Sequence, residues 1–157
     1  MPITIPEENP KIEIYCDGAV SKNGKNDAVG GWGFAIWIND ILFHESFGKV
    51  EHRATNQRCE LLAAINALDS VVTSKYEISV FSDSAYLCNA FNDKWFDKWK
   101  ITGWLNSNNQ PVANQDLWEK LMPYYYNKSI HWVKVKGHSN NARNEYVDSL
   151  AVQGRLS

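Results

Sequence analysis

Apolar and polar residues alternate along the first third of the chain with the period of two that is typical of β-strands. The alternation recurs in three runs, at residues 11–17, 32–39 and 41–50. Asn39 and Asp40, a typical turn pair, lie between the second and third runs. We therefore expect three strands in an antiparallel meander. Residues 21–31 are rich in Gly, Asn and Lys and are predicted to form a turn.

Helical spacing replaces this alternation after residue 55. Apolar residues recur there at intervals of three and four, which predicts a helix over residues 55–72. The two periods then alternate, with strands expected at 76–83 and 130–136 and helices at 84–91, 95–100, 114–126 and 144–153. Pro123 is expected to disturb the helix that contains it. The predicted fold class is α/β: a mixed five-stranded sheet, in which parallel strands join the meander, flanked by helices.

Length and composition narrow the possibilities further. A chain of 157 residues has an ordinary size for one domain, and we expect a flexible lead at 1–10 and a single domain at 11–154. No apolar stretch approaches the roughly 18 residues of a membrane span, and the first residues lack a secretory signal. The three cysteines lack metal-ligand spacing and suit packed, reduced thiols. These features predict a cytoplasmic protein that does not associate with membranes.

Four acidic residues stand at positions where a charge is costly. Asp17 and Asp83 end apolar strand-like runs. Glu60 lies at the apolar start of a helix, and Asp148 lies in the last helical segment. One such acid is usually a helix cap or a surface charge, but four that converge would repel one another unless divalent cations lay between them. A metal-binding carboxylate cluster is therefore the leading hypothesis.

The overall charge argues at first against a nucleic-acid partner. The formal net charge is −2 and the pI is near 6.1, whereas nonspecific binding of DNA or RNA normally needs a basic surface. Two divalent ions at the acidic cluster would add four positive charges and turn −2 into +2. The local distribution of charge therefore matters more than the total.

Short motifs around these acids resemble ribonuclease H of type 1. They are Asp17-Gly18, Thr55-Asn56-Gln57-Arg58-Cys59-Glu60-Leu61, Ser82-Asp83-Ser84, Gly137-His138 and Asn144-Glu145 with Asp148. Separate motifs in the family's order make the resemblance specific, and it covers about residues 11–153. A helical insert at about 93–113, rich in Trp, also resembles the handle of the family's longer members.

The resemblance implies the ribonuclease H-like fold and an endonuclease that hydrolyses the RNA strand of RNA/DNA hybrids, leaving 5′-phosphate and 3′-hydroxyl ends. Such an enzyme removes RNA primers and hybrids in DNA replication and repair. The reaction needs a positioned water, neutralised charge and a stabilised leaving oxygen, and two metal ions about 4 Å apart supply all three. Two Mg²⁺ ions are expected, for which Mn²⁺ can substitute. The expected ligands are Asp17, Glu60, Asp83 and Asp148, with Asp17 as the bridge.

Two further residues near these acids match the family. His138 precedes Asp148 by ten residues in a polar loop. The matching histidine of the family assists proton transfer or product release, work that suits a group titrating near neutral pH. A mobile surface histidine without a role is the alternative. Glu145 matches a family glutamate that supports the metal ligands, although a solvated helix glutamate would give the same pattern.

Recognition of RNA requires contact with the 2′-hydroxyl, which both donates and accepts hydrogen bonds, as side-chain amides do. Asn23, Asn56 and Gln57 occupy positions that resemble the family's contacts to the RNA strand. Turn formation is the alternative role of Asn23. Helix capping is the alternative role of Asn56 and Gln57.

The DNA strand is expected to contact a different set of residues. Arg53, Thr55 and Asn114 match a family pocket for a DNA phosphate, which combines a guanidinium, a hydroxyl and an amide. Tyr86 and Trp99 resemble the channel in which aromatic rings pack against deoxyribose. Packing of the insert against the body is the alternative for Trp99, because another Trp precedes it by four residues.

Two other functions fit part of the pattern. A nuclease or integrase-like enzyme acting on DNA needs the carboxylates but not Asn56, Gln57 or the phosphate pocket. A module that binds hybrid or structured RNA without cutting it would leave the repulsive cluster unexplained. The expected partner is therefore an RNA/DNA hybrid, bound by a monomer.

Overall fold

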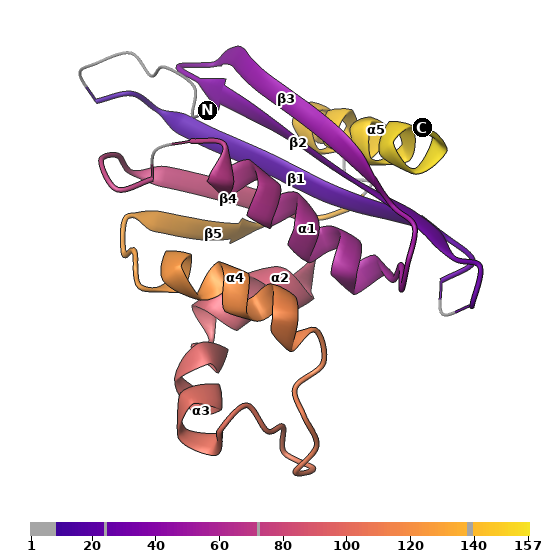
Figure 1. Ribbon diagram of the computed structural model, residues 1–157. Helices are drawn as coiled ribbons and strands as arrows, with labels where there is room; N and C mark the ends of the chain where they lie inside the picture. Colours follow the sequence, from indigo (N-terminus) through magenta and orange to yellow (C-terminus); the bar gives the residue numbers. More distant parts are fainter. Residues whose placement is uncertain (1–8, 24, 72, 138–139) are drawn as a thin grey trace.

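The computed structural model describes residues 9–23, 25–71, 73–137 and 140–157. Within these residues, five strands form one sheet in the order β3-β2-β1-β4-β5, flanked by helices (Figure 1). The strands are β1 (Ile12–Ser21), β2 (Val29–Ile38), β3 (Ile41–Val50), β4 (Ile78–Ser82) and β5 (Ile130–Lys134). The helices are α1 (Asn56–Asp69), α2 (Ala85–Asn92), α3 (Trp95–Thr102), α4 (Gln115–Tyr125) and α5 (Ala142–Leu156). The predicted mixed five-stranded α/β fold is confirmed.

The two halves of the sheet differ in strand direction. β1, β2 and β3 pair in antiparallel fashion as the predicted meander. β4 pairs with β1 in parallel, and β5 pairs with β4 in parallel. Each parallel connection runs through helices, because a parallel pair cannot be joined by a tight turn.

The first hairpin is longer than the apolar pattern predicts. β1 continues to Ser21 and β2 begins at Val29, so the expected turn over 21–31 is wrong for residues 29–31. Gly30 pairs with Val20, and Gly31 pairs with Ala19. Glycine has no side chain to show alternation, although its backbone pairs like that of any other residue.

Helices cover both faces of the sheet (Figure 1). α1 lies on one face over the main core, which also takes in side chains of α2 and α4. The largest buried side chains of this core include Trp118, Phe34, Phe96, Ile14 and Leu61. α5 lies on the other face over a smaller cluster of Tyr15, Ala35, Val147 and Leu150.

Local signals set most helix ends. Thr55 begins α1 by accepting a hydrogen bond from the Arg58 N–H at 3.0 Å, and Asn141 begins α5 through the Asn144 N–H at 3.1 Å. α5 therefore starts two residues before the expected 144 and continues past the expected end at 153. Pro123 does not break its helix. It lies in the last turn of α4, so only Tyr124 and Tyr125 of the helix follow it and a local distortion there affects little of the helix.

The structure also bears on the remaining sequence expectations. All three cysteines are buried and unpaired, as expected of packed thiols. The predicted lead at 1–10 falls mostly outside the described residues. Among the described helices, none has the length and apolar character needed to cross a bilayer.

The predicted insert contains α3 and the loop that follows it, which extend beyond the sheet (Figure 1). Trp99 packs within this insert and onto the body: its ring centroid lies 5.2 Å from that of Trp104 and 5.4 Å from that of the buried Trp118. Trp95 contacts Trp99 and Trp118 edge to face. These rings attach the insert to the core, which is the packing alternative raised for Trp99.

Glycines in β2 allow α5 to approach the sheet closely. A Cβ added at Gly31 would lie 2.1 Å from the carbonyl oxygen of Ala151 and 2.3 Å from the backbone nitrogen of Arg155. A Cβ at Gly33 would lie 2.7 Å from the Ala151 nitrogen. These atoms are backbone, so any side chain would force the helix away from the sheet.

We predict that Gly31→Ala lowers the free energy of unfolding by about 3 kcal/mol, because α5 must shift to accept the methyl group. For a chain of this size, that loss corresponds to a fall of about 6–12 °C in melting temperature. Thermal unfolding followed by circular dichroism measures it.

Gly103→Ala is the matched control. Gly103 has a φ of 69° and no neighbour within 4 Å of an added Cβ, so its substitution costs only backbone strain of about 1–2 kcal/mol. Equal losses at the two glycines would contradict the close-packing explanation.

Candidate active site

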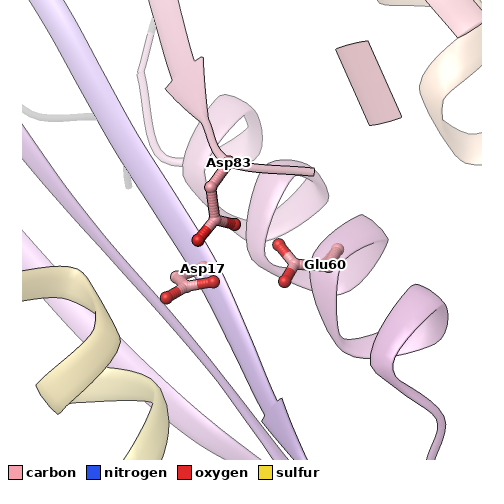
Figure 2. Close-up of side chains that lie close together, drawn as sticks. All are labelled: Asp17, Glu60 and Asp83. Carbon is pink, nitrogen blue, oxygen red and sulfur yellow. The ribbon is translucent and has the colours of Figure 1, made fainter. Parts of the chain in front are cut away.

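Three carboxylates from three different parts of the chain face one another beside the central strands β1 and β4 (Figure 2). Asp17 belongs to β1, Glu60 to α1, and Asp83 directly follows β4. One oxygen from each residue lies within 4.8 Å of the others. The predicted convergence of these three acids is therefore observed.

The lengths of the strands create the space for this cluster. β1 pairs with β4 only as far as Tyr15 and Phe81, and β4 ends one residue later. Asp17 thus lies within β1 rather than at its end, contrary to the sequence expectation, because β1 continues along β2 beyond the end of β4. Beside it, the chain leaves the sheet at Asp83.

Gly18 brings Glu60 to the other two acids. A Cβ added at Gly18 would lie 2.6 Å from Cβ of Cys59 and 2.8 Å from the backbone nitrogen of Glu60. α1 can therefore rest directly on the backbone of β1 at the residue that follows Asp17. The Gly18 N–H also donates a hydrogen bond of 2.9 Å to Oδ1 of Asp17, which orients that carboxylate.

A polar cleft of about 480 Å³ opens over the cluster. It is lined by Asp17, Gly18, Asn56, Gln57, Glu60, Asp83, Ser84, Asn144, Glu145 and Asp148. The fourth predicted acid, Asp148 of α5, thus reaches the same cleft. Two more predicted residues, Asn56 and Gln57, line it from the first turn of α1.

Burial and mutual repulsion change the protonation of the cluster. Burial raises the pKa of Asp17 to about 8, and the charge of Asp83 adds to the rise. Burial also raises the pKa of Glu60 well above its usual range, and the charges of Asp17 and Asp83 act in the same direction. The arrangement therefore holds protons tightly unless another positive charge replaces them.

The residues of the cleft fit a divalent metal ion. Among the described residues, Oε2 of Glu60 and Oδ1 of Asn144 are buried acceptors without a hydrogen-bond donor. Such acceptors are costly to bury unless a donor or a cation completes them. The donor set consists of carboxylate and amide oxygens, the hard ligands that Mg²⁺, Mn²⁺ and Ca²⁺ prefer.

The predicted RNA-strand residues lie together at the start of α1. Thr55 is the helix cap, so Asn56 and Gln57 are exposed residues of the first turn and do not cap the helix. Oδ1 of Asn23 accepts a hydrogen bond of 3.2 Å from the Asn56 N–H. This bond places the first polar loop next to α1, although Asn23 does not line the cleft.

The predicted DNA-strand residues form a second group outside the cleft lining. Nδ2 of Asn114 donates to the Tyr86 hydroxyl at 3.1 Å, as does the indole of Trp118. Oδ1 of Asn114 accepts from Arg58 of α1 at 3.2 Å. Thr55 caps the same helix, so the hydroxyl and the amide of the predicted phosphate pocket are linked through Arg58.

Arg53 and Trp99 complete the predicted DNA-strand set. Arg53 is exposed, with a left-handed φ of 57°, in the loop before α1. Trp99 is half-buried among the rings of the insert.

Of the last two predicted residues, Glu145 and His138, the structure describes only the first. Glu145 is exposed in the first turn of α5 and lines the cleft. His138 lies outside the described residues. The residue before it, Gly137, is close to the cluster: an added Cβ would lie 3.2 Å from Oδ2 of Asp83.

Several residues of the site were missed by sequence reasoning. Asn144 is 4% exposed and lines the cleft, and Ser84 lines it while capping α2 through the Leu87 N–H at 3.1 Å. Both were part of matched motifs but were given no role. Arg58 and Asp116 form a bidentate ion pair of 2.9 and 2.8 Å. The two residues are 58 positions apart, so no local sequence pattern could predict that they pair.

Comparison with known proteins agrees with this arrangement. A family model described as RNase H matches residues 9–155. Ribonuclease H of Caldanaerobacter subterraneus subsp. tengcongensis is 43% identical over 145 residues, which are 92% of this chain and 91% of the relative. Ribonuclease H of Acetivibrio thermocellus is 45% identical over 141 residues, or 90% and 92% of the two chains.

Solved structures share the fold at lower identity. LC9-RNase H1, a type 1 RNase H with the type 2 active-site motif, has a TM-score of 0.79 at 22% identity, covering 96% of this chain and 74% of that chain. The foamy viral protease-reverse transcriptase in complex with RNA/DNA hybrid has a TM-score of 0.81 at 18% identity, covering 99% and 22%. Since the family model spans nearly the whole chain and relatives above 40% identity align over about nine-tenths of it, the chain belongs to the ribonuclease H family.

Proposed function

We propose that this protein is an endonuclease that hydrolyses the RNA strand of RNA/DNA hybrids and leaves 5′-phosphate and 3′-hydroxyl ends. It acts as a monomer in the cytoplasm and removes RNA primers and hybrids during DNA replication and repair. The observation that carries the proposal is the meeting of Asp17, Glu60 and Asp83 within 4.8 Å, in one cleft with Asp148. Membership of the ribonuclease H family supports the same reaction.

The four acids would hold two divalent ions, Mg²⁺ or Mn²⁺. When bound, such ions supply charge neutralisation at the phosphate and an activated water. Asp17, which the Gly18 N–H orients through Oδ1, would be the ligand that both ions share. Glu60 supplies an oxygen that accepts no hydrogen bond within the described part of the chain. Asp83 and Asp148 complete the set from β4 and α5.

Proton transfer is the role we propose for His138. An imidazole titrates near neutral pH and can deliver a proton to the leaving 3′ oxygen or help the product depart. The adjacent Gly137 is close to Asp83, which supports this assignment. Glu145, exposed and lining the cleft from α5, would support the metal ligands.

Strand discrimination would come from the amides at the start of α1. Asn56 and Gln57 are exposed and line the same cleft as the acids, within reach of a ribose next to the scissile phosphate. An amide both donates to and accepts from a 2′-hydroxyl, a group that deoxyribose lacks. Asn23, bonded to the Asn56 N–H, would extend this contact along the RNA strand.

The DNA strand would contact the second group of residues. Thr55, Asn114 and the exposed Arg53 would bind one DNA phosphate, while Tyr86 and the half-buried Trp99 would pack against deoxyribose. The first turn of α1 adjoins both groups, since Asn56 and Gln57 line the acidic cleft while Thr55 caps the helix and Arg58 bonds to Asn114. A hybrid bound across that turn would present its RNA strand to the acids.

We predict that the wild-type protein with Mg²⁺ cleaves a labelled RNA strand paired to DNA, but not the same strand alone or paired to RNA, and does not cleave duplex DNA. Asp83→Asn should lower kcat by at least about 100-fold, because it removes a metal ligand from the cluster. Gel analysis of the labelled products, with and without EDTA, measures both effects.

Glu77→Gln is the control, since Glu77 precedes β4 whereas Asp83 follows it, and its exposed side chain pairs with His131 far from the cleft. Its activity should match that of the wild type. Cleavage of duplex DNA would favour the DNA-nuclease alternative, and binding of hybrid without cleavage would favour a binding module.

We further predict that, without divalent ions, the free energy of unfolding falls as the pH rises from about 4 to 8. The folded pKa of Asp17, about 8, lies above its unfolded value of about 3.8, so the folded state binds more protons throughout this range and loses that advantage as the pH rises. Asp17→Asn should therefore raise the free energy of unfolding at pH 8.5 by at least about 1 kcal/mol, or about 3 °C in melting temperature.

Thermal melts in EDTA and in Mg²⁺ test this prediction. Mg²⁺ should stabilise the wild type more than Asp17→Asn, since the ion replaces the missing protons. Asp27→Asn is the control: Asp27 is exposed and paired with Lys22, so its loss should not stabilise the protein. A wild type whose stability rises between pH 4 and 8 in EDTA would contradict the prediction.

A further inference from the structure

An ion pair between Arg58 and Asp116 joins α1 to α4. It has no role in the proposed reaction. Both guanidinium nitrogens of Arg58 bond to the carboxylate of Asp116, at 2.9 Å and 2.8 Å. The Arg58 side chain is 19% exposed and that of Asp116 is 61% exposed. Such a bidentate pair fixes the direction of the guanidinium as well as its position.

The same guanidinium holds the side chain of Asn114. Nη1 of Arg58 lies 3.2 Å from Oδ1 of Asn114. Since a guanidinium only donates hydrogen bonds, the amide oxygen of Asn114 must face Arg58 and its amide nitrogen must face away. That nitrogen donates one hydrogen to the Tyr86 hydroxyl at 3.1 Å, which leaves its second hydrogen for another acceptor.

The ion pair also leaves Arg53, and not Arg58, as the cation that is available to a ligand. Asp116 bonds to both terminal nitrogens of Arg58, so within the described part of the chain the guanidinium near Thr55 without an ion-pair partner is that of the exposed Arg53. The Thr55 hydroxyl is held separately, by the backbone N–H of residue 58, which donates to Oγ1 at 3.0 Å as the cap of α1. The Arg58 side chain thus orients the Asn114 amide and leaves the Thr55 hydroxyl to the helix cap.

We propose that Arg58 and Asp116 are positioning residues that hold the Asn114 amide in the orientation that binds a phosphate of the DNA strand. This inference rests on the proposed function. The ion pair touches neither the acids nor the cleft that they line. Its loss should therefore weaken hybrid binding and leave the chemical step unchanged.

Steady-state cleavage of an RNA/DNA hybrid by Asp116→Asn, with Glu119→Gln as the matched control, tests this inference. Both variants remove one negative charge from α4, and Glu119 bonds only to Gln115 of the same helix in the described structure. A change of charge alone would lower KM in both, because the hybrid is an anion. Positioning predicts instead that Asp116→Asn raises KM about three- to ten-fold with kcat within about two-fold of the wild type.

A double variant separates positioning from a direct contact by Asp116. Asn114→Ala should raise KM by itself, and adding Asp116→Asn to it should raise KM no further. Arg58→Lys, which keeps the charge but loses the bidentate geometry, should raise KM as Asp116→Asn does. The melting temperature of Asp116→Asn should stay within about 3 °C of the wild type, since the Asp116 side chain is 61% exposed.

The outcomes distinguish this inference from the proposed function. If the wild type does not cleave the hybrid, the proposed function fails. If the wild type cleaves it and Asp116→Asn behaves like Glu119→Gln, or if its effect adds fully to that of Asn114→Ala, the positioning role is overturned while the proposed function stands.

Discussion

Crowded carboxylates can share a small volume only if the surrounding fold holds them together against their repulsion. At an effective dielectric constant of 20, two unit charges 4.8 Å apart repel by about 3 kcal/mol, so three ionised acids would oppose folding by an amount comparable to the whole stability of a domain. The raised pKa values of Asp17 and Glu60 express this cost. Folding tolerates it because α1 rests on the backbone of β1 at Gly18, which leaves Glu60 no other place. A divalent cation removes the penalty that the packing imposes.

On the opposite face of the sheet, glycines likewise allow a helix to pack directly on the strand backbone. Gly31 and Gly33 let α5 approach β2 at backbone distance, and α5 delivers Asp148 and the buried Asn144 to the cleft. Both helices thus approach the sheet closely where the strands lack side chains. Close packing of this kind suits chemistry that requires acids at fixed separations. The insert stands apart from this arrangement and is attached to the body through aromatic packing.

Periodicity predicted the mixed five-stranded sheet and most of the helices, because both depend on local patterns of apolar residues. The motifs around the acids predicted that these side chains would converge. The extension of β1 and β2 could not be read from the chain, since glycines carry no hydrophobic signal and their role is a close contact with a distant helix. The link from Arg58 to Asn114 and Asp116 was hidden for a related reason: it joins residues more than 50 positions apart that only the fold brings together. The role of Asn144 could not be predicted, because an asparagine is common on helix surfaces and only its burial in the structure places it in the site.

We propose that the four acids form one metal site, in which a divalent ion relieves their mutual repulsion. Carbon-13 NMR of the side-chain carboxyl groups during a Mg²⁺ titration tests it most directly, because each acid is observed separately. We expect the signals of Asp17, Glu60, Asp83 and Asp148 to move along one binding curve and Mg²⁺ to lower the pKa of Asp17 from about 8. Signals that do not respond to Mg²⁺, or an Asp17 that titrates near 4 in its absence, would contradict it.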